Sequence, residues 1–305
     1  MINGIINIYK ESGYTSHDVG AKLRGILKQK KVGHTGTLDP EATGVLPVCL
    51  GSATKLCDMI TDTSKEYEVK MQLGITTDTL DLSGTISSRS EVTVSEKEIE
   101  KTMLRFVGGY DQIPPMYSAL KVNGKKLYEL AREGKEIERK PRRVELPYIK
   151  ILEMELPYVR YIVGCSKGTY IRSLCADIGE QLGCGAAMAE LKRTKVGNFF
   201  VEESITLDQI AQYAAEGRLE QYVFASDRIV IGCNGATVKP KAERFLLNGN
   251  KLYFSQLDME NEAARFTEGD LLRVYMLESE EQRELKAVYQ YISEENCFKP
   301  FKMLL

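Results

Sequence analysis

The chain has 305 residues, of which 43% are hydrophobic and 28% are charged, the composition of a globular protein with room for one large domain and one small domain. It contains no run of about 18 uncharged apolar residues, and its first residues lack the basic stretch and long apolar stretch of a signal peptide. Length and composition therefore predict a cytoplasmic protein without a membrane segment.

The cysteine and histidine content argues against metal chemistry. The seven cysteines are odd in number and form no C-x-x-C pair, which disfavours both a disulfide framework and a zinc site. The two histidines, His17 and His34, offer little material for a histidine-based metal centre. We expect metal-free chemistry.

Charge is distributed unevenly along the chain, although the net charge is only −2. Residues 119–143 contain nine Lys or Arg against four Asp or Glu, whereas residues 256–300 contain five against eleven. A basic segment on a nearly neutral protein is typical of a face that binds a polyanion. A solvated helix surface has the same charge pattern, so both interpretations stay open.

The N-terminal part of the chain predicts strands and helices in succession. Residues 4–8 alternate apolar positions as a short strand does, and Ser16 stands at the N-cap position of a helix. Residues 45–55 predict a buried strand and a tight turn at Gly51 into another helix. The next strand carries four side chains on one face, namely Tyr67, Val69, Met71 and Leu73.

Helix boundaries are clear in the middle of the chain. Ser95 and Glu98 have the spacing of a capping box, and Gly108 and the glycine after it close the helix that follows. The sequence "VNGKK" at residues 122–126 has the Asn-Gly signature of a tight turn, after which Leu127 begins a short helix.

Two further strands and a helix follow. The strands are predicted around residues 144–152 and 158–163. Thr169 is placed to cap a helix with apolar residues three or four apart, and Gly183 lies just past its end. Because strands and helices are mixed without a strict β-α-β repeat, we predict an α+β fold with a mixed, mostly antiparallel sheet and flanking helices.

A domain boundary is predicted near residues 226–236. The remaining segment of roughly 70 residues has turn signals between short β-like runs such as "LLRVYML" and "LKAVYQY". We therefore expect a large domain over residues 1–230 and a small, mostly β domain over residues 231–305.

Several common catalytic motifs are absent. The chain has no G-x-x-x-x-G-K-[ST], no strand-linked G-x-G-x-x-G, no G-x-S-x-G and no H-E-x-x-H. Nucleotide hydrolysis, dinucleotide redox chemistry and α/β-hydrolase chemistry therefore lose support.

Asp39 is the one acid in the glycine- and threonine-rich segment "GHTGTLDP". Asp before Pro is a common structural arrangement, because the carboxylate caps free N–H groups and Pro fits the first helical position. The functional alternative is that a loop of small residues lets a ligand approach and presents one carboxylate as a nucleophile or base.

Arg172 is expected in the first turn of its helix, where the positive end of the helix dipole disfavours a cation by roughly 0.3 to 1 kcal/mol. An anionic group should compensate. The candidates are a structural Asp or Glu, a substrate phosphate, or the catalytic carboxylate itself. Sequence spacing does not choose among them.

Aromatic residues beside polar turns offer a second functional pattern. Tyr67 and Tyr170 have the placement of side chains that stack on a nucleobase, although amphipathic tyrosines at the edge of a core are commoner. His34, between two glycine-containing turns, is by itself better interpreted as a hydrogen-bonding loop residue than as a catalyst.

Five segments carry a resemblance to a known family: "GHTGTLDPEATGVLPVCLGSATK" (33–55), "KEYEVKMQLGITTDTLDLSG" (65–84), "IPPMYSALKVNGKKLYELAREG" (113–134), "CSKGTYIRSLCADIGEQLGCGA" (165–186) and "LKRTKVGNF" (191–199). Together they resemble the bacterial tRNA pseudouridine-55 synthases of the TruB type. They occur in family order over roughly the first 200 residues, which chance does not explain.

The resemblance implies a pseudouridine synthase fold with a central cleft, plus a small C-terminal domain of the RNA-binding PUA type. It implies that a uridine in the T-loop of tRNA is detached at its N-glycosidic bond, turned, and rejoined to ribose through C5. It implies no cofactor, no metal and no protein partner, so the expected partner of a monomeric enzyme is the T-arm stem-loop of tRNA.

The resemblance also assigns roles to single residues. Asp39 matches the catalytic aspartate, Arg172 the arginine that pairs with it, and Tyr67 the tyrosine that stacks on the flipped base and takes the C5 proton. His34, Tyr170 and Leu191 match positions that contact the extruded nucleotide.

The basic segment, about residues 110–143, corresponds to the part of the family fold that grips the T-arm through backbone phosphates. The further expected RNA contacts are Lys10, Lys121, Lys192 and Arg193.

Three features depart from the family pattern. Glu11 stands where proline is common after the lysine, and Lys192 replaces an arginine, which keeps the charge but loses the planar fork. The acidic C-terminal third matches poorly, and we expect it to add little RNA affinity. Two alternatives stay open, an RNA-binding or RNA-folding protein without turnover and a synthase that acts on another RNA.

Overall fold

The computed structural model describes residues 1–122, 124–279 and 282–305. Within them a nine-stranded sheet has the order β11-β12-β4-β13-β3-β1-β15, with β14 on β13 and β2 on β3. Its strands are β1 (Gly4–Lys10), β2 (Val32–His34), β3 (Thr43–Leu50), β4 (Lys65–Leu73), β11 (Tyr148–Glu155), β12 (Tyr158–Cys165), β13 (Ala186–Val196), β14 (Phe199–Phe200) and β15 (Val223–Phe224).

Most neighbours in this sheet are antiparallel, and β13 is parallel to β3. The predicted α+β class with a mixed, mostly antiparallel sheet is therefore confirmed. β4 alternates strictly between buried and half-buried residues, as its sequence predicts, and so turns Tyr67 and Val69 toward the core. β3 is buried along nearly its whole length because its two faces pack into different apolar clusters, Leu46 and Val48 into one and Val45 and Cys49 into the other.

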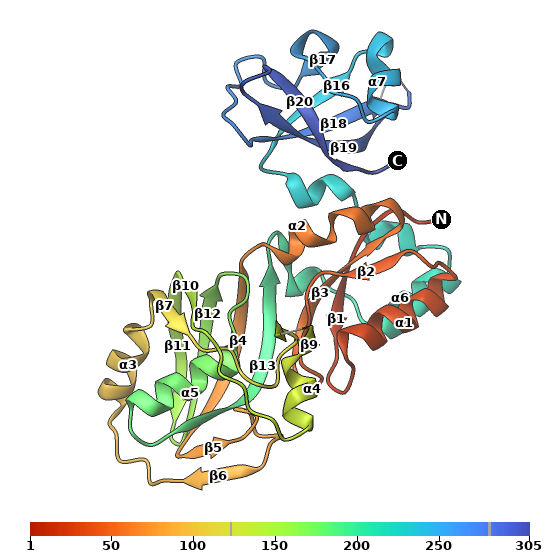
Figure 1. The fold of residues 1–305 in the computed structure, drawn as a ribbon. Coiled ribbons are helices and arrows are strands. Elements are labelled where there is room, and N and C mark those ends of the chain that lie inside the picture. The colour runs from red at the N-terminus through yellow and green to blue at the C-terminus, as the bar shows by residue number, and fades with distance from the viewer. Residues whose placement is uncertain (123, 280–281) are drawn as a thin grey trace.

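Helices cover the sheet in two groups (Figure 1). The helices α1 and α6 pack together at the β1 end, whereas α3 and α5 contact the strands at the β11–β13 end. The bounds of these helices are α1 (Ser16–Leu27), α3 (Glu96–Leu104), α5 (Ile171–Gln181) and α6 (Leu207–Ala215). Each group covers its own hydrophobic core, one containing Val19 and Ile210 and the other Tyr67 and Leu174.

The helix caps differ in part from the prediction. The capping box of Ser95 and Glu98 is confirmed. The N-cap of α1 is Thr15 rather than Ser16, and the Ser16 hydroxyl accepts a hydrogen bond from a distant loop instead. Thr169 does not cap α5, because its hydroxyl donates to the Ser166 carbonyl at 2.9 Å. The predicted glycine stop after α3 is also wrong, since the helix ends at Leu104 and the glycines begin a strand.

The basic segment folds as an excursion from the large sheet. Strand β7 pairs with β10, and the hairpin of β8 and β9 leads into α4. The predicted strand at 144–152 is two strands, β10 and β11, and the asparagine of the predicted "VNGKK" turn lies outside the described residues. These elements are β7 (Gly108–Gln112), β8 (Lys121–Val122), β9 (Lys125–Lys126), α4 (Leu127–Arg132) and β10 (Arg142–Leu146), while β5 (Ile75–Thr77) and β6 (Ile86–Arg89) form a separate hairpin.

The C-terminal part forms a five-stranded sheet of order β17-β16-β18-β19-β20 with its own aromatic-rich core. Its elements are β16 (Asn234–Val238), α7 (Glu243–Leu247), β17 (Leu257–Met259), β18 (Leu271–Leu277), β19 (Arg283–Ile292) and β20 (Cys297–Met303). The small, mostly β character predicted for this part is confirmed. It stands apart from the rest of the molecule and joins it beside α2 (Cys57–Thr61) (Figure 1).

A small apolar cluster and several polar contacts connect this C-terminal sheet to the larger part. Leu56 packs with Val288 and other apolar side chains of the C-terminal sheet. Lys302 on β20 pairs with Asp58, and the Tyr275 hydroxyl donates to Asp227 at 3.1 Å. Among the described residues, no helix is long and apolar enough to cross a membrane.

Candidate active site

Asp39 lies in a loop whose backbone is fixed on both sides of it. The Leu38 N–H donates to Ser16 Oγ at 2.9 Å, and the Pro40 carbonyl accepts a hydrogen bond from Lys10 Nζ at 2.8 Å. Leu38 is also buried in the core that lies beneath α5. The Asp39 side chain itself remains 37% exposed. A rigid loop therefore presents a carboxylate that solvent or a ligand can reach.

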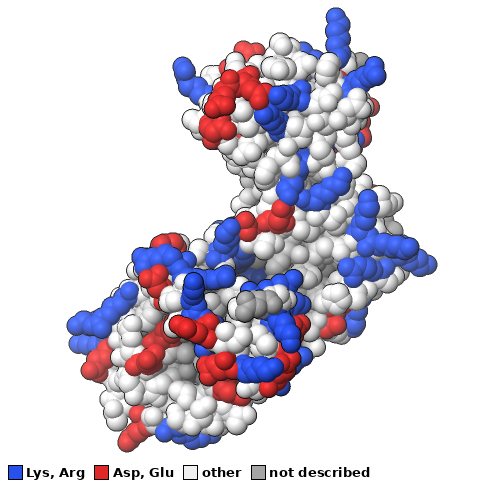
Figure 2. Space-filling view, viewed as in Figure 1, with Lys and Arg blue, Asp and Glu red and all other residues white. Residues whose placement is uncertain are grey.

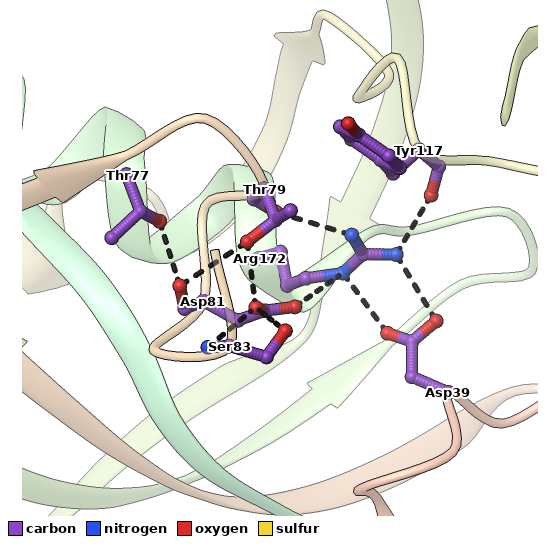
Figure 3. A network of polar contacts seen from close by, with 7 residues as sticks. All are labelled: Asp39, Thr77, Thr79, Asp81, Ser83, Tyr117 and Arg172. Carbon is purple, nitrogen blue, oxygen red and sulfur yellow. Dashed lines mark hydrogen bonds and ion pairs between the residues drawn. The ribbon is translucent and has the colours of Figure 1, made fainter. Parts of the chain in front are cut away.

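Arg172 meets the Asp39 carboxylate edge-on (Figure 3). Its Nε lies 2.9 Å from Asp39 Oδ2, and its Nη2 lies 3.0 Å from Asp39 Oδ1. The other donors of the guanidinium bind the Thr79 carbonyl at 3.1 Å and the Tyr117 carbonyl at 2.8 Å. The side chain of Arg172 is only 8% exposed. Of the three partners considered for Arg172, the structure contains the candidate catalytic carboxylate, in direct contact, and a second aspartate slightly farther away.

The capping interpretation of Asp39 is not what the structure shows. The turn after Asp39 is closed by a backbone hydrogen bond of 3.1 Å, from the Ala42 N–H to the Asp39 carbonyl. Among the contacts of the described residues, the carboxylate oxygens bond to Arg172. The side chain is therefore directed toward Arg172 rather than toward the first turn of a helix.

A second carboxylate, Asp81, lies on the other side of the guanidinium, and the sequence reasoning missed it. Its Oδ2 is 3.7 Å from Arg172 Nε. Its Oδ1 accepts hydrogen bonds from the Thr79 hydroxyl at 2.7 Å and from the hydroxyl and N–H of Ser83 at 2.6 and 3.1 Å (Figure 3). Two acids therefore surround one buried arginine. The signal in the sequence was an acid in the turn-rich "TTDTLDLSG", but nothing in that turn indicated its distant partner.

Tyr67 lies on β4 directly opposite Arg193 of β13. The tyrosine is 8% exposed and the arginine 1%. Burial raises the pKa of the Tyr67 hydroxyl, and the nearby Arg193 cation acts in the opposite direction. Arg193 Nε donates to the Val45 carbonyl at 2.7 Å, whereas its buried Nη2 has no partner among the described residues. The residue opposite Tyr67 in the sheet therefore has a buried donor without a described partner.

Lys10 and Arg193 are more enclosed than RNA contacts usually are. The Lys10 side chain is 0% exposed, and its ammonium donates to the carbonyls of Glu11 and Pro40 at 3.0 and 2.8 Å. Burial lowers the pKa of Lys10 to about 8. Arg193 of β13 stands opposite Gly44 of β3, close to the end of the Asp39 loop. Gly44 has φ near 101°, and the Arg193 backbone leaves too little room there for a Cβ. Both cations therefore hold backbone on either side of the Asp39 loop.

The remaining predicted residues surround this centre at different depths. His34 ends β2, its Nδ1 is buried without a partner among the described residues, and burial lowers its pKa. Tyr170 is half-buried at the N-terminus of α5, and Leu191 packs against the same core as Tyr67. No described group of three or more His, Cys, Asp or Glu has the arrangement of a metal site.

The two predicted lysine contacts lie on different elements. Lys121 is exposed on the hairpin of β8 and β9, opposite Lys126. Lys192 is half-buried on β13, in register with Glu68 of β4 and Thr43 of β3. The structure therefore places Lys121 on a protruding surface and Lys192 near the end of the Asp39 loop.

Comparison with known proteins identifies the family. Residues 24–171 match the model described as "TruB family pseudouridylate synthase (N terminal domain)", and residues 172–231 match the "tRNA pseudouridylate synthase B C-terminal domain". The chain belongs to the TruB family. Both family models together include every residue of the Asp39, Arg172, Asp81 and Tyr67 cluster.

Relatives and solved structures support the same assignment for this TruB family chain. It is 49% identical to tRNA pseudouridine synthase B of Lachnoclostridium phytofermentans over 312 residues, covering 100% of both chains. It is 44% identical to the protein of that name from Clostridium tetani, covering 90% of this chain and 92% of the other. A chain in "Crystal Structure of a Cbf5-Nop10-Gar1 Complex" has a TM-score of 0.76 at 30% identity, covering 99% of this chain and 85% of that one. The predicted family and pseudouridine synthase fold are confirmed.

Proposed function

We propose that this chain converts uridine 55 in the T-loop of tRNA to pseudouridine. The observation that carries the proposal is the paired contact between Arg172 and the exposed carboxylate of Asp39. Its family membership supports the same reaction, because its relatives are named tRNA pseudouridine synthase B. The reaction rearranges bonds within one nucleotide, so atoms balance without a second substrate.

Asp39 acts as the nucleophile toward the flipped nucleotide in this proposal. The bond between N1 and the ribose C1′ breaks, the base turns, and a bond forms between C5 and C1′, after which C5 loses a proton and N1 gains one. A covalent link to a carboxylate divides such a difficult exchange into easier steps. The two contacts from Arg172 fix the plane of the carboxylate, so attack begins from one orientation.

Tyr67 is proposed to stack on the flipped base and to take the proton from C5. A general base needs close approach to the proton that it removes, and β4 places Tyr67 in the same core as Leu38, the residue before Asp39. The charge of Asp39 is near enough to contribute to the raised pKa of Tyr67. Its neighbour Arg193 favours the form of the hydroxyl that accepts a proton.

The uridine must leave its stack before this chemistry, because C5 and the glycosidic carbon are not accessible together in a stacked base. Extruding a loop nucleotide costs only a few kcal/mol, roughly the cost of unstacking and unpairing. We assign contact with the extruded nucleotide to His34 at the end of β2, Tyr170 at the start of α5 and Leu191 against the core that contains Tyr67. Lys192 extends this set along β13.

Phosphate contacts are proposed for the basic excursion around residues 110–143. Lys121, Lys140 and Arg142 are exposed there and form no ion pair among the described residues. Figure 2 shows basic and acidic side chains interspersed over both parts of the molecule. We assign Lys10 and Arg193 to the support of the cleft, since both are buried. The proposal includes a monomer acting in the cytoplasm, a catalytic domain of residues 1–230 and a PUA-like domain of residues 231–305.

The decisive experiment uses an unmodified T-arm stem-loop as substrate. Pseudouridine is mapped after incubation with the wild-type chain, with Asp39→Asn and with Asp62→Asn, an exposed aspartate that pairs with Lys167. We expect product at the T-loop uridine with the wild type and Asp62→Asn, and none with Asp39→Asn.

Binding of the same stem-loop separates this function from its alternatives. Asp39→Asn should bind within a few-fold of wild type, because phosphates and shape dominate affinity. Tight binding by the wild type without product would favour an RNA-binding or RNA-folding protein. Product at a uridine of another RNA, but not of tRNA, would favour a synthase with a different substrate.

A further inference from the structure

Gln112 holds the start of α5 from outside that helix. It is the last residue of β7 and is 1% exposed. Its side-chain Oε1 accepts a hydrogen bond from the Tyr170 N–H at 2.7 Å, and its Nε2 donates to the Tyr170 carbonyl at 3.0 Å. One amide therefore binds both polar groups of a single backbone residue, which removes its freedom to rotate.

This contact replaces a cap that the sequence of α5 lacks. Tyr170 is the N-cap residue, and no side chain of its own segment caps the helix. The Tyr170 carbonyl also accepts the Leu174 N–H at 3.1 Å, so the same carbonyl belongs to the helix and to the Gln112 contact. The position of the first turn is therefore set by β7, a neighbouring strand, rather than by local sequence.

Two further contacts join the same turn to the chain that follows Gln112. The Ser173 hydroxyl donates to the Ile113 carbonyl at 3.0 Å, and Arg172 Nη2 donates to the Tyr117 carbonyl at 2.8 Å. Residues 170–173 and 112–117 are thus connected at three places, and Gln112 contributes the contact that uses two hydrogen bonds. Arg172 lies in the middle of this connection and holds Asp39 on its outer side.

The orientation of the Gln112 amide is itself fixed by Tyr110. Gln112 Nε2 also donates to the Tyr110 hydroxyl oxygen in a short contact. Burial raises the pKa of the Tyr110 hydroxyl, and Asp177 is near enough that its charge contributes to this rise, which favours the protonated form. Flipping the amide would place Oε1 against the Tyr170 carbonyl and leave the Tyr170 N–H facing a donor. The observed orientation is the one that satisfies every partner.

Resting on the function proposed above, we propose that Gln112 is a positioning residue for pseudouridine formation. It fixes the first turn of α5, and through that turn it sets the place of Tyr170 and the angle at which Arg172 presents Asp39. Gln112 touches neither the carboxylate nor the space in front of it, so its effect is indirect. Tyr110 supports the same function by orienting the amide.

The chain contains a matched control for this role. Gln29 is 8% exposed and binds another backbone residue in the same way, with its Oε1 accepting from the Ile2 N–H at 2.8 Å and its Nε2 donating to the Ile2 carbonyl at 2.9 Å. Ile2 packs against the core beneath α1, away from α5. Substitution of Gln29 therefore measures how much stability is lost with such a contact when the candidate active site is not involved.

The test compares Gln112→Glu with Gln29→Glu in the full chain. Glutamate keeps the shape and the acceptor but loses both donated hydrogen bonds. We expect Gln112→Glu to lower the single-turnover rate of pseudouridine formation on the T-arm stem-loop between about tenfold and about a hundredfold, the range for small misplacements of reacting groups. Stem-loop affinity should stay within a few-fold. Gln29→Glu should lower Tm by about as much as Gln112→Glu does, and it should leave the single-turnover rate within about twofold of wild type.

A pH series adds a measurement that a purely structural defect does not change. A buried glutamic acid becomes protonated as the pH falls and regains one donor. The rate of Gln112→Glu relative to wild type should therefore rise from about pH 8 to about pH 6, the range in which buried carboxyl groups titrate. A constant ratio would contradict the role of the donated hydrogen bonds.

Other outcomes also decide the question. A wild-type rate for Gln112→Glu, or an equal rate loss for Gln29→Glu, would overturn the positioning role while leaving the proposed function intact. If Gln112→Glu does not fold, Tyr110→Phe takes its place, with an expected loss of a few-fold in rate and unchanged affinity, and a wild-type rate would overturn the proposal. Absence of pseudouridine with the wild-type chain would reject both the proposed function and this inference.

Discussion

Arg172 holds Asp39 through two parallel contacts, Nε to Oδ2 at 2.9 Å and Nη2 to Oδ1 at 3.0 Å. The arginine is 8% exposed and the aspartate 37%, so the pair has a buried end and an open end. The remaining guanidinium donors are bound to the carbonyls of Thr79 and Tyr117. Because these carbonyls come from separate segments, the direction of the guanidinium is determined by the fold rather than by Asp39.

Arg172→Lys should therefore reduce activity strongly, although the substitution keeps the positive charge. A lysine ammonium cannot make two parallel contacts, and it leaves one of the two buried carbonyls without its donor. We expect the single-turnover rate of pseudouridine formation to fall by about a hundredfold or more, corresponding to about 3 kcal/mol. Arg218→Lys is the control, because Arg218 pairs with Glu216 on the surface of the molecule. Equal rates for both variants would show that the paired geometry is not required.

Asp81→Asn should reduce the rate without removing it. The amide keeps an acceptor for the Thr79 and Ser83 donors but loses the negative charge 3.7 Å from Arg172 Nε. Arg172 then has one anion instead of two, and we expect a loss of about tenfold, or about 1.4 kcal/mol. Asp78→Asn is a matched control in the same turn, since Asp78 accepts the Thr85 N–H at 2.7 Å. A larger effect from Asp78→Asn would contradict a specific role for Asp81.

Part of this site could be predicted from the sequence. A cation in the first turn of a helix indicated an anionic partner, and Asp39 is one. Asp81 was missed because its turn and α5 lie about ninety residues apart and meet only in the folded chain. Gln112 was missed for a similar reason, since a buried amide at the end of a strand has no signature in local sequence.

The fold was predictable where pattern and burial agree. β4 alternates in sequence and in structure, and the capping box at Ser95 forms as its spacing requires. Thr169 is of a residue type that caps helices, but its hydroxyl donates to the Ser166 carbonyl, and Gln112 of β7 binds the N-cap residue Tyr170. The burial of Lys10 could not be predicted either, because lysines are almost always exposed. In the structure Lys10 is 0% exposed and its ammonium donates to two carbonyls.

Lys10 should make the stability of the protein depend on pH. Burial lowers its pKa from 10.5 to about 8, so between these values the unfolded chain binds a proton that the folded chain has released. The free energy of unfolding should therefore rise with pH in this window. From about pH 7.5 to about pH 9.5 the wild type should gain about 2 kcal/mol more than Lys10→Met. Urea denaturation at both pH values measures the difference.

The control for this experiment is Lys30→Met, which removes an exposed lysine just after α1. Its stability should follow the wild-type pH dependence. Parallel stability curves for the wild type and Lys10→Met would show that burial does not perturb Lys10 in the folded protein.

Lys121 should contribute to RNA affinity through a phosphate contact. It is exposed on the β8–β9 hairpin and has no ion pair among the described residues. Lys121→Ala should reduce the slope of log affinity against log salt by about 0.7 to 0.9, the change expected for one phosphate. The rate at saturating stem-loop should stay unchanged. Lys299→Ala, which removes a lysine paired with Glu295 on the C-terminal sheet, should leave the slope as it is.

Tyr67→Phe should slow the step that follows detachment of the base. The variant keeps the aromatic ring that fills the core beside Leu38 but loses the hydroxyl proposed to take the C5 proton. With a stem-loop tritiated at C5 of the target uridine, we expect tritium release to slow by about a hundredfold or more, while affinity stays within a few-fold. Tyr161→Phe removes a buried hydroxyl, which lies 3.3 Å from Cys175 Sγ, and should release tritium at the wild-type rate.

Because burial raises the pKa of Tyr67, its ionisation should not increase the wild-type rate between about pH 7 and about pH 9. Wild-type tritium release by Tyr67→Phe would assign the proton transfer to another group.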